Sequence, residues 1–375
     1  MKTPNLLRSR SRLWLLSFAV GMAWSNLTVA HAATEPNLKK FFTVTPGGQL
    51  IVDVDRGSID LSTGDVSDLE VEVIRIVTGK SVAKTEEILA AHEITFAQDA
   101  NKVEVHAKMK KDFNGLFNVG GLNLNVQYKI SIPKKFNLDL KTAAGSVTVG
   151  DLVGELKART AGGSLKFGNI EGPVNGNTSA GSIHLASANG PVAVKTAGGS
   201  IDLGKVEADT VAETSAGSIT VKVAKAKLVV KSAGGSINLG ELDGETMAET
   251  SAGSIEVKKS KAKLVAKSSG GSLSIDDALE AVDARTSAGS VTASFSAQPT
   301  SDCRLSTAGG SVRVKVAANL AFDVDAKTNG GQVKTDLPID DGGGKNKSSL
   351  QGKLNGGGKA LILKTSAGGI SLNKL

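Results

Sequence analysis

Apolar residues recur along this chain with a period of two, inside a larger repeat of 18 residues. The repeat is marked by Thr or Ser, two small residues, Gly and Ser, and its final serines are evenly spaced at Ser146, Ser164, Ser182, Ser200, Ser218, Ser236, Ser254, Ser272 and Ser290. Each serine is followed by an apolar, a variable and another apolar residue. This alternation predicts a strand with one buried face. A second alternation, such as Val192, Val194 and Thr196, precedes each signature and predicts a second strand.

A constant spacing without gaps indicates that each repeat is one turn of the chain, stacked on the turn before it. The sequence therefore predicts an all-β fold, a single-stranded parallel β-helix (β-solenoid) with coils of about 18 residues. We expect the regular solenoid to span residues 142–335, with looser copies of the signature at Ser311 and Gln332. Residues 336–375 are expected to form a Gly-rich loop and a terminal coil, and the stretch 341–358 to fold over that end.

Residues 33–141 predict an N-terminal cap that includes the first coil, because Gly57-Ser58-Ile59 is already a copy of the signature. Alternating segments at 69–76, 102–107 and 122–132 predict strands, and residues 84–91 predict one short helix with Glu86 and Glu87 in its first turn. A β-rich cap of this kind is expected because the open end of a solenoid exposes unpaired strand edges.

The first 32 residues have the pattern of a secretory signal peptide. Four basic residues precede an apolar stretch from Leu13 to Trp24, and Ala30-His31-Ala32 supplies a small-residue cleavage pattern. The chain is therefore expected to be exported, to a periplasmic, outer-envelope or extracellular location. Loss of the four basic residues lowers the net charge from +7 to +3, so the basic pI indicates no nucleic-acid partner. The mature chain contains no candidate transmembrane segment.

Two columns of the repeat are expected to have structural roles. The corner glycines, which precede the serines, are Gly145, Gly163, Gly181, Gly199, Gly217, Gly235, Gly253, Gly271 and Gly289. Either a positive φ or a lack of room for a Cβ beside the next coil would explain this column. The Thr or Ser three residues before each corner glycine is expected to stack on its equivalents and exchange hydroxyl hydrogen bonds with them.

The residue before this Thr or Ser alternates in charge from coil to coil, as Lys195, Glu213, Lys231, Glu249 and Lys267. Stacked coils would place these side chains in a ladder of opposite charges, each pair contributing about 0.2–1 kcal/mol. The ladder is expected to favour one register, because a one-coil slip would bring like charges together. Cys303, the only cysteine, aligns with inward residues. It is therefore expected to be a buried thiol without a disulfide partner.

The sequence offers little catalytic or metal-binding chemistry. His92, His106 and His184 are scattered along the chain, and each is expected to be hydrogen-bonded or exposed to solvent. No carboxylate pair recurs, and the Asp ladder that calcium-binding β-rolls require is missing from the repeat. We therefore predict no catalytic residue, no metal site and no cofactor, and we expect the protein not to be an enzyme.

One group of lysines is a candidate binding surface. The lysines recur at equivalent positions two coils apart, as Lys222, Lys225 and Lys227, then Lys258, Lys261 and Lys263. They form either a basic stripe for anionic glycans or lipopolysaccharide, or a solvated face in which acidic residues intervene.

Several short segments resemble one known family. The run Val126-Gln127-Tyr128-Lys129-Ile130-Ser131-Ile132-Pro133 leads into Leu138-Asp139-Leu140-Lys141-Thr142-Ala143-Ala144-Gly145, and a tail has Thr335-Asp336-Leu337-Pro338, a Gly-rich loop and Leu361-Ile362-Leu363-Lys364-Thr365. This combination resembles the bacterial "putative adhesin" family of secreted β-helix proteins, a domain of unknown function. The resemblance implies a right-handed β-helix, the hand that parallel crossovers favour in general.

Three functions fit these observations. The first is a non-enzymatic secreted or envelope β-solenoid that serves as an adhesin or scaffold surface for a protein or an envelope glycan. The alternative is a periplasmic sensor or accessory protein that recognises an envelope component. The third is a polysaccharide-cleaving β-helix enzyme, which the gapless 18-residue spacing disfavours because it leaves no long loops to build a catalytic groove.

Overall fold

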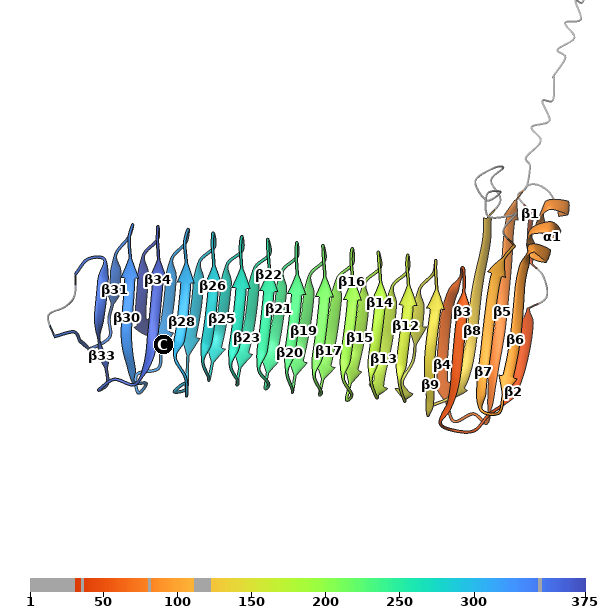
Figure 1. The fold of residues 1–375 in the computed structure, drawn as a ribbon, viewed down its shortest axis with the longest axis horizontal. Coiled ribbons are helices and arrows are strands. Elements are labelled where there is room, and N and C mark those ends of the chain that lie inside the picture. The colour runs from red at the N-terminus through yellow and green to blue at the C-terminus, as the bar shows by residue number, and fades with distance from the viewer. Residues whose placement is uncertain (1–30, 35–36, 80–81, 111–122, 343–345) are drawn as a thin grey trace, which may run out of the picture.

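The computed structural model describes residues 31–34, 37–79, 82–110, 123–342 and 346–375. These residues form a long rod of stacked β-strands, with a broader cap at the N-terminal end (Figure 1). The rod has two parallel sheets, here called sheet A and sheet B. The predicted all-β solenoid is therefore confirmed.

Each regular coil contributes one strand to each sheet. In sheet A these strands are β10 (Val147–Val149), β11 (Leu152–Val153), β13 (Leu165–Glu171), β15 (Ile183–Ala188), β17 (Ile201–Val206), β19 (Ile219–Ala224), β21 (Ile237–Leu242), β23 (Ile255–Ser260), β25 (Leu273–Ala278), β27 (Val291–Phe295) and β29 (Val312–Val316). In sheet B they are β12 (Leu156–Thr160), β14 (Val174–Thr178), β16 (Val192–Thr196), β18 (Thr210–Thr214), β20 (Leu228–Ser232), β22 (Thr246–Thr250), β24 (Leu264–Ser268), β26 (Val282–Thr286) and β28 (Cys303–Thr307). Neighbouring strands pair in parallel with equivalent residues opposite each other, as Ile183 is opposite Ile201.

The core lies between the two sheets and repeats in every coil. In β17, Ile201, Leu203 and Val206 point inward, and in β18 Thr210 and Ala212 do the same; each is at most 1% exposed. The alternation of apolar residues therefore does what the sequence predicts, with small and branched side chains filling a thin interior. The residues between them point outward and give the rod two broad faces.

The N-terminal cap is built from nine strands and one helix. They are β1 (His31–Thr34), β2 (Leu38–Thr43), β3 (Gly48–Val54), β4 (Ser58–Gly64), β5 (Asp68–Gly79), α1 (Val82–Ala91), β6 (His92–Asp99), β7 (Lys102–Met109), β8 (Asn123–Pro133) and β9 (Phe136–Thr142). The helix begins at Val82, two residues before the predicted start. Glu86 and Glu87 therefore lie beyond its first turn, and that expectation was wrong.

The first coil of the chain is not the first coil of the rod. Strand β3 pairs in parallel with both β7 and β9, and β4 pairs with both β8 and β10. The coil made by β3 and β4 is therefore held between later segments of the chain. Beyond it, β5 and β6 pair antiparallel with β8 and β7, and β2 adds to β5.

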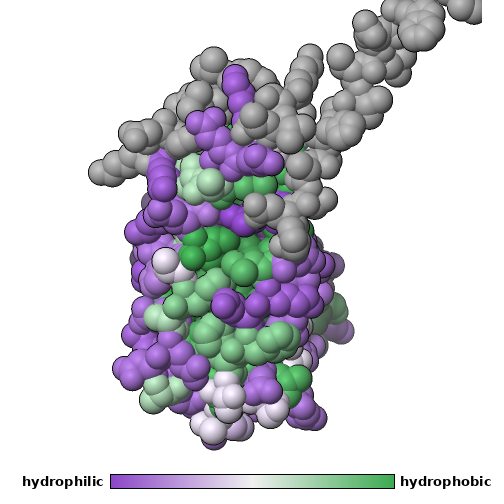
Figure 2. Space-filling model, turned by 90° about the vertical axis from the view of Figure 1, so that its right-hand side faces the viewer, coloured by the Kyte–Doolittle hydropathy of each residue, from purple (hydrophilic) through white to green (hydrophobic). Residues whose placement is uncertain are grey.

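Apolar side chains close the core at the cap end of the rod. Leu38 and Phe42 from β2, with Ile94 and Phe96 from β6, are partly buried against the core. The rings of Phe42 and Phe96 have centroids 6.2 Å apart. Figure 2, which looks at this end, shows apolar side chains in its middle and polar side chains around them.

The C-terminal end has a similar insertion. Its strands are β30 (Phe322–Thr328), β31 (Val333–Thr335), β32 (Ile339–Asp340), β33 (Ser349–Leu354), β34 (Lys359–Thr365) and β35 (Ile370–Lys374). Strand β34 pairs in parallel with β28 and β30, and β35 pairs with β29 and β31. The last coil of the sequence is therefore inserted before the coil of β30 and β31, and the C-terminus lies inside the rod rather than at its tip (Figure 1).

The Gly-rich stretch 341–358 contains a strand where a loop was expected. Strand β33 lies within it and pairs antiparallel with β30, and β32 pairs with the other edge of β33. The stretch thus covers the end of the rod by hydrogen-bonding to the outermost strand of sheet B. An antiparallel addition of this kind satisfies the edge that a solenoid would otherwise leave open.

The predicted signal peptide lies largely outside the described residues, which begin at His31. Residues His31–Thr34 form β1, which pairs antiparallel with the end of β5, so the predicted cleavage position after Ala32 falls within this strand. In the described part of the chain, no helix has both the length and the apolar character needed to cross a membrane.

Candidate binding surfaces

The corner glycines line one edge of the rod, where each packs on the glycine of the preceding coil. A Cβ added at Gly217 would lie 2.1 Å from the carbonyl oxygen of Gly199, and one at Gly163 would lie 1.9 Å from that of Gly145. Of the nine corner glycines, only Gly145 has a φ in the left-handed range, at +149°. Close stacking of backbones, rather than a positive φ, is therefore the explanation that the geometry favours for this column.

The hydroxyls beside these corners bond to backbone rather than to one another. The Oγ1 of Thr214 donates to the carbonyl oxygen of Gly199 at 2.8 Å and accepts from the backbone N–H of Gly217 at 3.3 Å. Ser232 makes the same two bonds in the next coil. The expected exchange of bonds between stacked hydroxyls was wrong, because the corner carbonyl of the preceding coil is the nearer acceptor. Each hydroxyl joins two coils through their backbones.

The charge ladder lies on the outward face of sheet B. Lys195 contacts Glu213 at 3.0 Å, and Glu249 contacts both Lys231 at 3.9 Å and Lys267 at 3.1 Å. Equivalent positions pair in register across the strands. The predicted ladder is confirmed, and its exposed ion pairs are each worth less than about 1 kcal/mol.

The six lysines of the candidate basic stripe do not form one continuous surface. Asp243, in the coil between them, contacts Lys225 at 2.6 Å and Lys261 at 2.8 Å. These two contacts hold the pKa of Asp243 at about 2, below its ordinary value. Lys258 is paired with Glu256 and with Asp276. Carboxylates therefore already occupy three of the six ammonium groups.

The other three lysines of this set are spread over two positions of the coil. Lys222 is equivalent to Lys258 and lies near it in a shallow hollow on sheet A. Lys227 and Lys263 are exposed at the turn that leads into sheet B, with Glu245 between them in the stacked coils. This arrangement is that of a solvated face of mixed charge, the second of the two interpretations of the sequence.

The three histidines are far apart in environment. His106 contacts Glu104 at 3.2 Å and His184 contacts Asp202 at 3.1 Å, both at partly exposed positions. His92 is only 2% exposed, and neither of its ring nitrogens has a hydrogen-bond partner among the described residues. The expectation that each histidine is satisfied or exposed was therefore wrong for His92. Burial lowers the pKa of His92 to about 4.

Two further buried groups lie in the solenoid and the cap. Cys303 is fully buried, as expected, and burial raises the pKa of its thiol to about 11. Tyr128 is buried in β8, and its hydroxyl has no hydrogen-bond partner among the described residues. Burial raises its pKa above the ordinary value. Within the described ranges, no group of three or more His, Cys, Asp or Glu side chains is placed to hold a metal ion.

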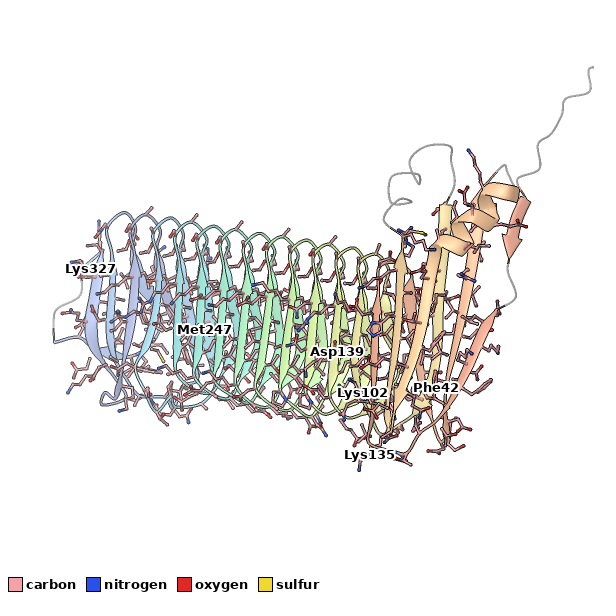
Figure 3. All side chains as sticks on the ribbon, turned by 45° about the vertical axis from the view of Figure 1, so that its right-hand side comes forward. Phe42, Lys102, Lys135, Asp139, Met247 and Lys327 are labelled. Atoms are coloured by element: carbon pink, nitrogen blue, oxygen red, sulfur yellow. The ribbon has the colours of Figure 1, made fainter. Side chains whose placement is uncertain are left out.

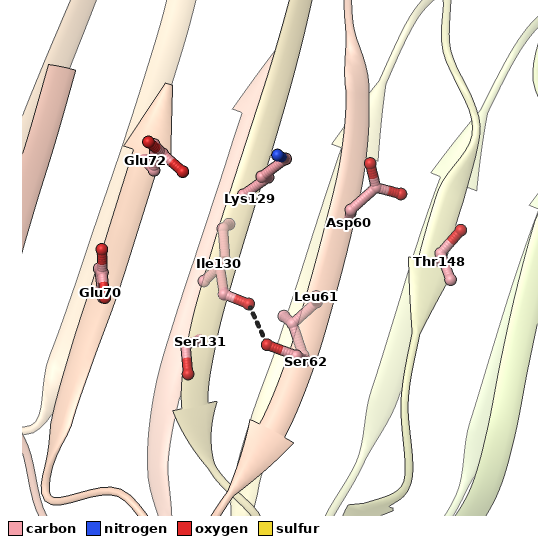
Figure 4. Close-up of a pocket in the computed structure, with 9 residues that line it drawn as sticks. All are labelled: Asp60, Leu61, Ser62, Glu70, Glu72, Lys129, Ile130, Ser131 and Thr148. Atoms are coloured by element: carbon pink, nitrogen blue, oxygen red, sulfur yellow. Dashed lines mark hydrogen bonds between the residues drawn. The ribbon is translucent and has the colours of Figure 1, made fainter. Parts of the chain in front are cut away.

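A groove of about 370 Å³ lies on the outward face of sheet A, where the cap meets the first coils. We call it the cap groove. It is lined by Asp60, Leu61, Ser62, Glu70, Glu72, Lys129, Ile130, Ser131 and Thr148 (Figure 4). These residues come from β4, β5, β8 and β10, four strands that are adjacent in space but separated along the chain.

The register of the strands arranges the polar residues of the cap groove in two rows. The first row runs from Glu72 through Lys129 and Asp60 to Thr148, each opposite the next across neighbouring strands. The second row is described by the same pairings and contains Glu70, Ser131 and Ser62. The two rows are two residues apart along each strand, so all of these side chains point to the same face.

Neighbouring side chains hold the carboxylates of the cap groove in place. Lys39 contacts Glu70 at 3.1 Å and Glu72 at 3.5 Å, and Asn37 donates to Glu72 at 2.7 Å. The bond from Asn37 lowers the pKa of Glu72. Gln127 donates to Asp60 at 2.6 Å. The carboxylates are therefore ionised near neutral pH and positioned to accept further hydrogen bonds.

An exposed aromatic ring continues the second row. Phe41, in β2, is opposite Glu70 and is 65% exposed on the same face as the cap groove. Sequence analysis did not single out this residue or the cap groove, because both depend on strand pairings that join residues 41, 60, 70, 131 and 148 across the cap. The alternation within each strand was the only local signal of their outward direction.

Comparisons with known proteins place the chain in a family. A family profile described as "Toastrack DUF4097" matches residues 50–373. No protein with a curated description matches the chain.

Several solved structures match at low sequence identity. A "putative cell adhesion protein" from Clostridium sporogenes is 11% identical, with 91% of this chain and 100% of that chain covered and a TM-score of 0.18. A "putative adhesin" from Bacteroides fragilis is 12% identical, with 91% and 98% covered and a TM-score of 0.16. A "putative lipid binding protein" from Parabacteroides distasonis is 14% identical, with 90% and 96% covered and a TM-score of 0.23.

Proposed function

The chain belongs to the Toastrack DUF4097 family, and from this premise we propose that it is a non-enzymatic, exported binding protein that uses its rod as an adhesion or scaffold surface. Its site of action is the cell envelope or the cell exterior. Its partner is held on the outward face of sheet A, with the cap groove as the point of closest contact.

The observation that carries this proposal is the constant stride of the coils. Equivalent residues pair across successive strands from β10 to β27, so the outward face of sheet A is one continuous surface. At about 4.8 Å per strand, nine coils give a face of roughly 40 Å. A surface of this length suits a polymer or a large partner better than a small molecule.

The chemistry of the cap groove favours a glycan as the partner. Three carboxylates and three hydroxyls line it, and these groups accept and donate hydrogen bonds to sugar hydroxyls. Phe41 supplies an exposed ring next to them, on which the apolar face of a sugar can pack. Because the carboxylates Asp60, Glu70 and Glu72 outnumber the one lysine of the lining, a neutral or amino-bearing glycan fits better than an anionic one.

A binding assay with purified envelope polysaccharide tests this proposal. The mature chain is immobilised and exposed to neutral and to acidic polysaccharide fractions from a bacterial envelope. We expect retention of the neutral or amino-bearing fraction without release of reducing ends. Phe41→Ser and Glu72→Gln should each weaken retention about tenfold, as loss of a stacking ring or a charged acceptor commonly does.

Val211→Ser is the matched control, because it removes an exposed apolar side chain from sheet B. Equal retention of the Phe41→Ser variant and the wild type would reject the cap groove as the contact. Failure to retain any polysaccharide would reject glycan binding. Release of reducing ends would instead favour the enzymatic alternative.

A further inference from the structure

The outward face of sheet B carries an apolar stripe that the fold itself does not require. Val211, Val229, Met247 and Val265 occupy equivalent positions in β18, β20, β22 and β24 and pair in register across these strands. Val211 is 41% exposed and Met247 is 36% exposed. Met247 lies in the middle stretch of the rod (Figure 3). We call these four residues the sheet B stripe.

Charged residues flank the sheet B stripe on both sides and alternate in sign along the rod. On one side they are Glu213, Lys231, Glu249 and Lys267, and on the other Asp209, Lys227, Glu245 and Lys263. Both flanking residues of a coil have the same sign, so a negative coil alternates with a positive one. Across these four coils the formal charges cancel. The face is therefore apolar in the middle, charged at its margins and neutral as a whole.

We propose that two copies of this chain associate antiparallel, face to face, through the sheet B stripe. A twofold axis that crosses the rods between β20 and β22 superimposes the coil of Lys231 on the coil of Glu249 in the second copy. It also places the coil of Glu213 against that of Lys267. Along the middle, Val229 then packs on Met247 of the second copy, and Val211 packs on Val265.

Charge complementarity selects this arrangement over its main alternative. With the twofold axis between β20 and β22, every negative coil of the four faces a positive coil. With a twofold axis parallel to the rods, each coil faces its own copy, so Glu249 meets Glu249 and Lys231 meets Lys231. Like charges opposed in this way disfavour association. Only antiparallel rods satisfy both the apolar stripe and its charged margins.

The area of this face indicates a weak, reversible dimer. A strand of five residues is about 16 Å wide, and the eight sheet B strands from β14 to β28 extend about 38 Å at the usual strand spacing. The product is roughly 600 Å² per copy, or about 1,200 Å² in total, at the lower limit for specific interfaces. Association is therefore expected at micromolar rather than nanomolar concentrations, and it should weaken as salt screens the margins.

Sedimentation equilibrium of the mature chain measures this association. We expect a monomer–dimer equilibrium in low salt over a protein concentration range of about 5–500 µM, shifted toward monomer in high salt. A chain that stays monomeric over this range overturns the proposal and leaves the sheet B stripe to a partner of another kind. Circular dichroism of each variant below shows that it is folded before its association is measured.

Two charge reversals give the sharper test. Glu249→Lys alone places lysines 231 and 249 of the two copies against each other twice, and Lys231→Glu alone does the same with carboxylates. Each variant should dimerise about tenfold more weakly than the wild type, as two exposed like-charge contacts predict. When the two variants are mixed, every facing pair becomes opposite in sign. The heterodimer should therefore form with close to wild-type affinity.

Mixing separates an interface from a merely structural role, because it changes nothing within either chain. Glu256→Lys, the same charge change on sheet A, is the control and should leave dimerisation unchanged. If the mixed variants remain monomeric, or if Glu256→Lys weakens dimerisation as much as Glu249→Lys, the antiparallel arrangement is wrong. This inference is independent of glycan binding, which concerns the opposite face of the rod.

Discussion

A single added methyl group at a corner glycine tests the stacking of the coils most directly. At Gly217, a Cβ would lie 2.1 Å from the carbonyl oxygen of Gly199 and 2.4 Å from its carbon. At Gly234, on the same edge of the next coil, the nearest heavy atom would lie 3.4 Å away. Alanine already occupies the position equivalent to Gly234 in alternate coils, as Ala216 does. Gly217→Ala and Gly234→Ala are thus a matched pair.

The expected difference follows from the hydrogen bonds around the corner. Because Cβ atoms essentially never approach other atoms within 3.0 Å, the two coils must separate locally by roughly 1 Å. That movement stretches the bond from Thr214 to the Gly199 carbonyl, now 2.8 Å, and the backbone bond from Ile201 to Ser218, now 2.9 Å. It also stretches the bond from the Ser218 amide to the Ser200 hydroxyl, now 3.2 Å.

Three such bonds at about 1 kcal/mol each predict a loss of about 3 kcal/mol in the free energy of unfolding for Gly217→Ala. Gly234→Ala disturbs none of them and removes conformational freedom from the unfolded chain. It is therefore expected to change stability by less than about 1 kcal/mol, in the stabilising direction.

Urea denaturation of the two purified variants, followed by circular dichroism, measures the difference. Because repeat proteins can unfold in parts, the comparison uses variants whose transitions have the same slope as the wild type. We expect a clearly lower midpoint for Gly217→Ala and an unchanged or higher midpoint for Gly234→Ala. Equal midpoints for the two variants would refute close backbone stacking as the reason for the glycine column.

Three further predictions concern buried groups. Thr214→Val should lower the free energy of unfolding by about 1–2 kcal/mol, whereas Thr214→Ser should not, because Ser232 makes the same bonds; equal urea midpoints would contradict this. His92 is neutral in the fold, with its pKa lowered to about 4 from 6.5, so the unfolded chain binds more protons between these values. Stability should therefore be constant above pH 6.5 and fall by about 2–3 kcal/mol as the pH drops to about 4; midpoints across this range should show the slope, and His92→Phe should abolish it. Cys303 should react with a thiol reagent at pH 8 only after unfolding, since its pKa is about 11 and it is fully buried; fast modification of the native chain would contradict this.

The regular coils could be predicted from the sequence because their information is local. In each coil, apolar residues such as Ile201 and Leu203 alternate over a few positions, and the same pattern returns 18 residues later. Two strands, their inward side chains and the burial of Cys303 follow from that repetition alone. The charge ladder followed as well, because stacking places equivalent residues in contact.

The ends of the rod could not be predicted in the same way, because their pairings join distant residues. Strand β34 pairs with β28, and Cys303 is opposite Leu361 across this pairing. Neither segment carries a local signal that the last coil of the sequence enters the rod before the coil of β30. The cap groove has the same origin, since Phe41, Glu70 and Ser131 become neighbours only through the antiparallel pairing of β5.

The hydroxyl bonds and His92 were mispredicted for related reasons. A stacked column of Thr suggests contact between hydroxyls, but the coil geometry brings the Gly199 carbonyl to Thr214 instead. His92 lies at the first position of β6, directly after α1, where the sequence gave no periodicity to indicate its direction. Both cases depend on where a turn places the backbone, which a pattern of side chains does not specify.

A period of two coils underlies both the register of the rod and the way in which two rods can meet. Lys231 lies between Glu213 and Glu249 in the stack, so insertion of a single coil would place like charges side by side, whereas insertion of two preserves the alternation. Where the alternation fails, the chain compensates locally: Arg285 is opposite Lys267, and Asp283 of the same strand contacts Arg285 at 2.6 Å. The same alternation makes the face of sheet B complementary to itself only when one rod is reversed. A repeat selected in pairs of coils for correct stacking would thus acquire, without any further change, a preferred direction for self-association.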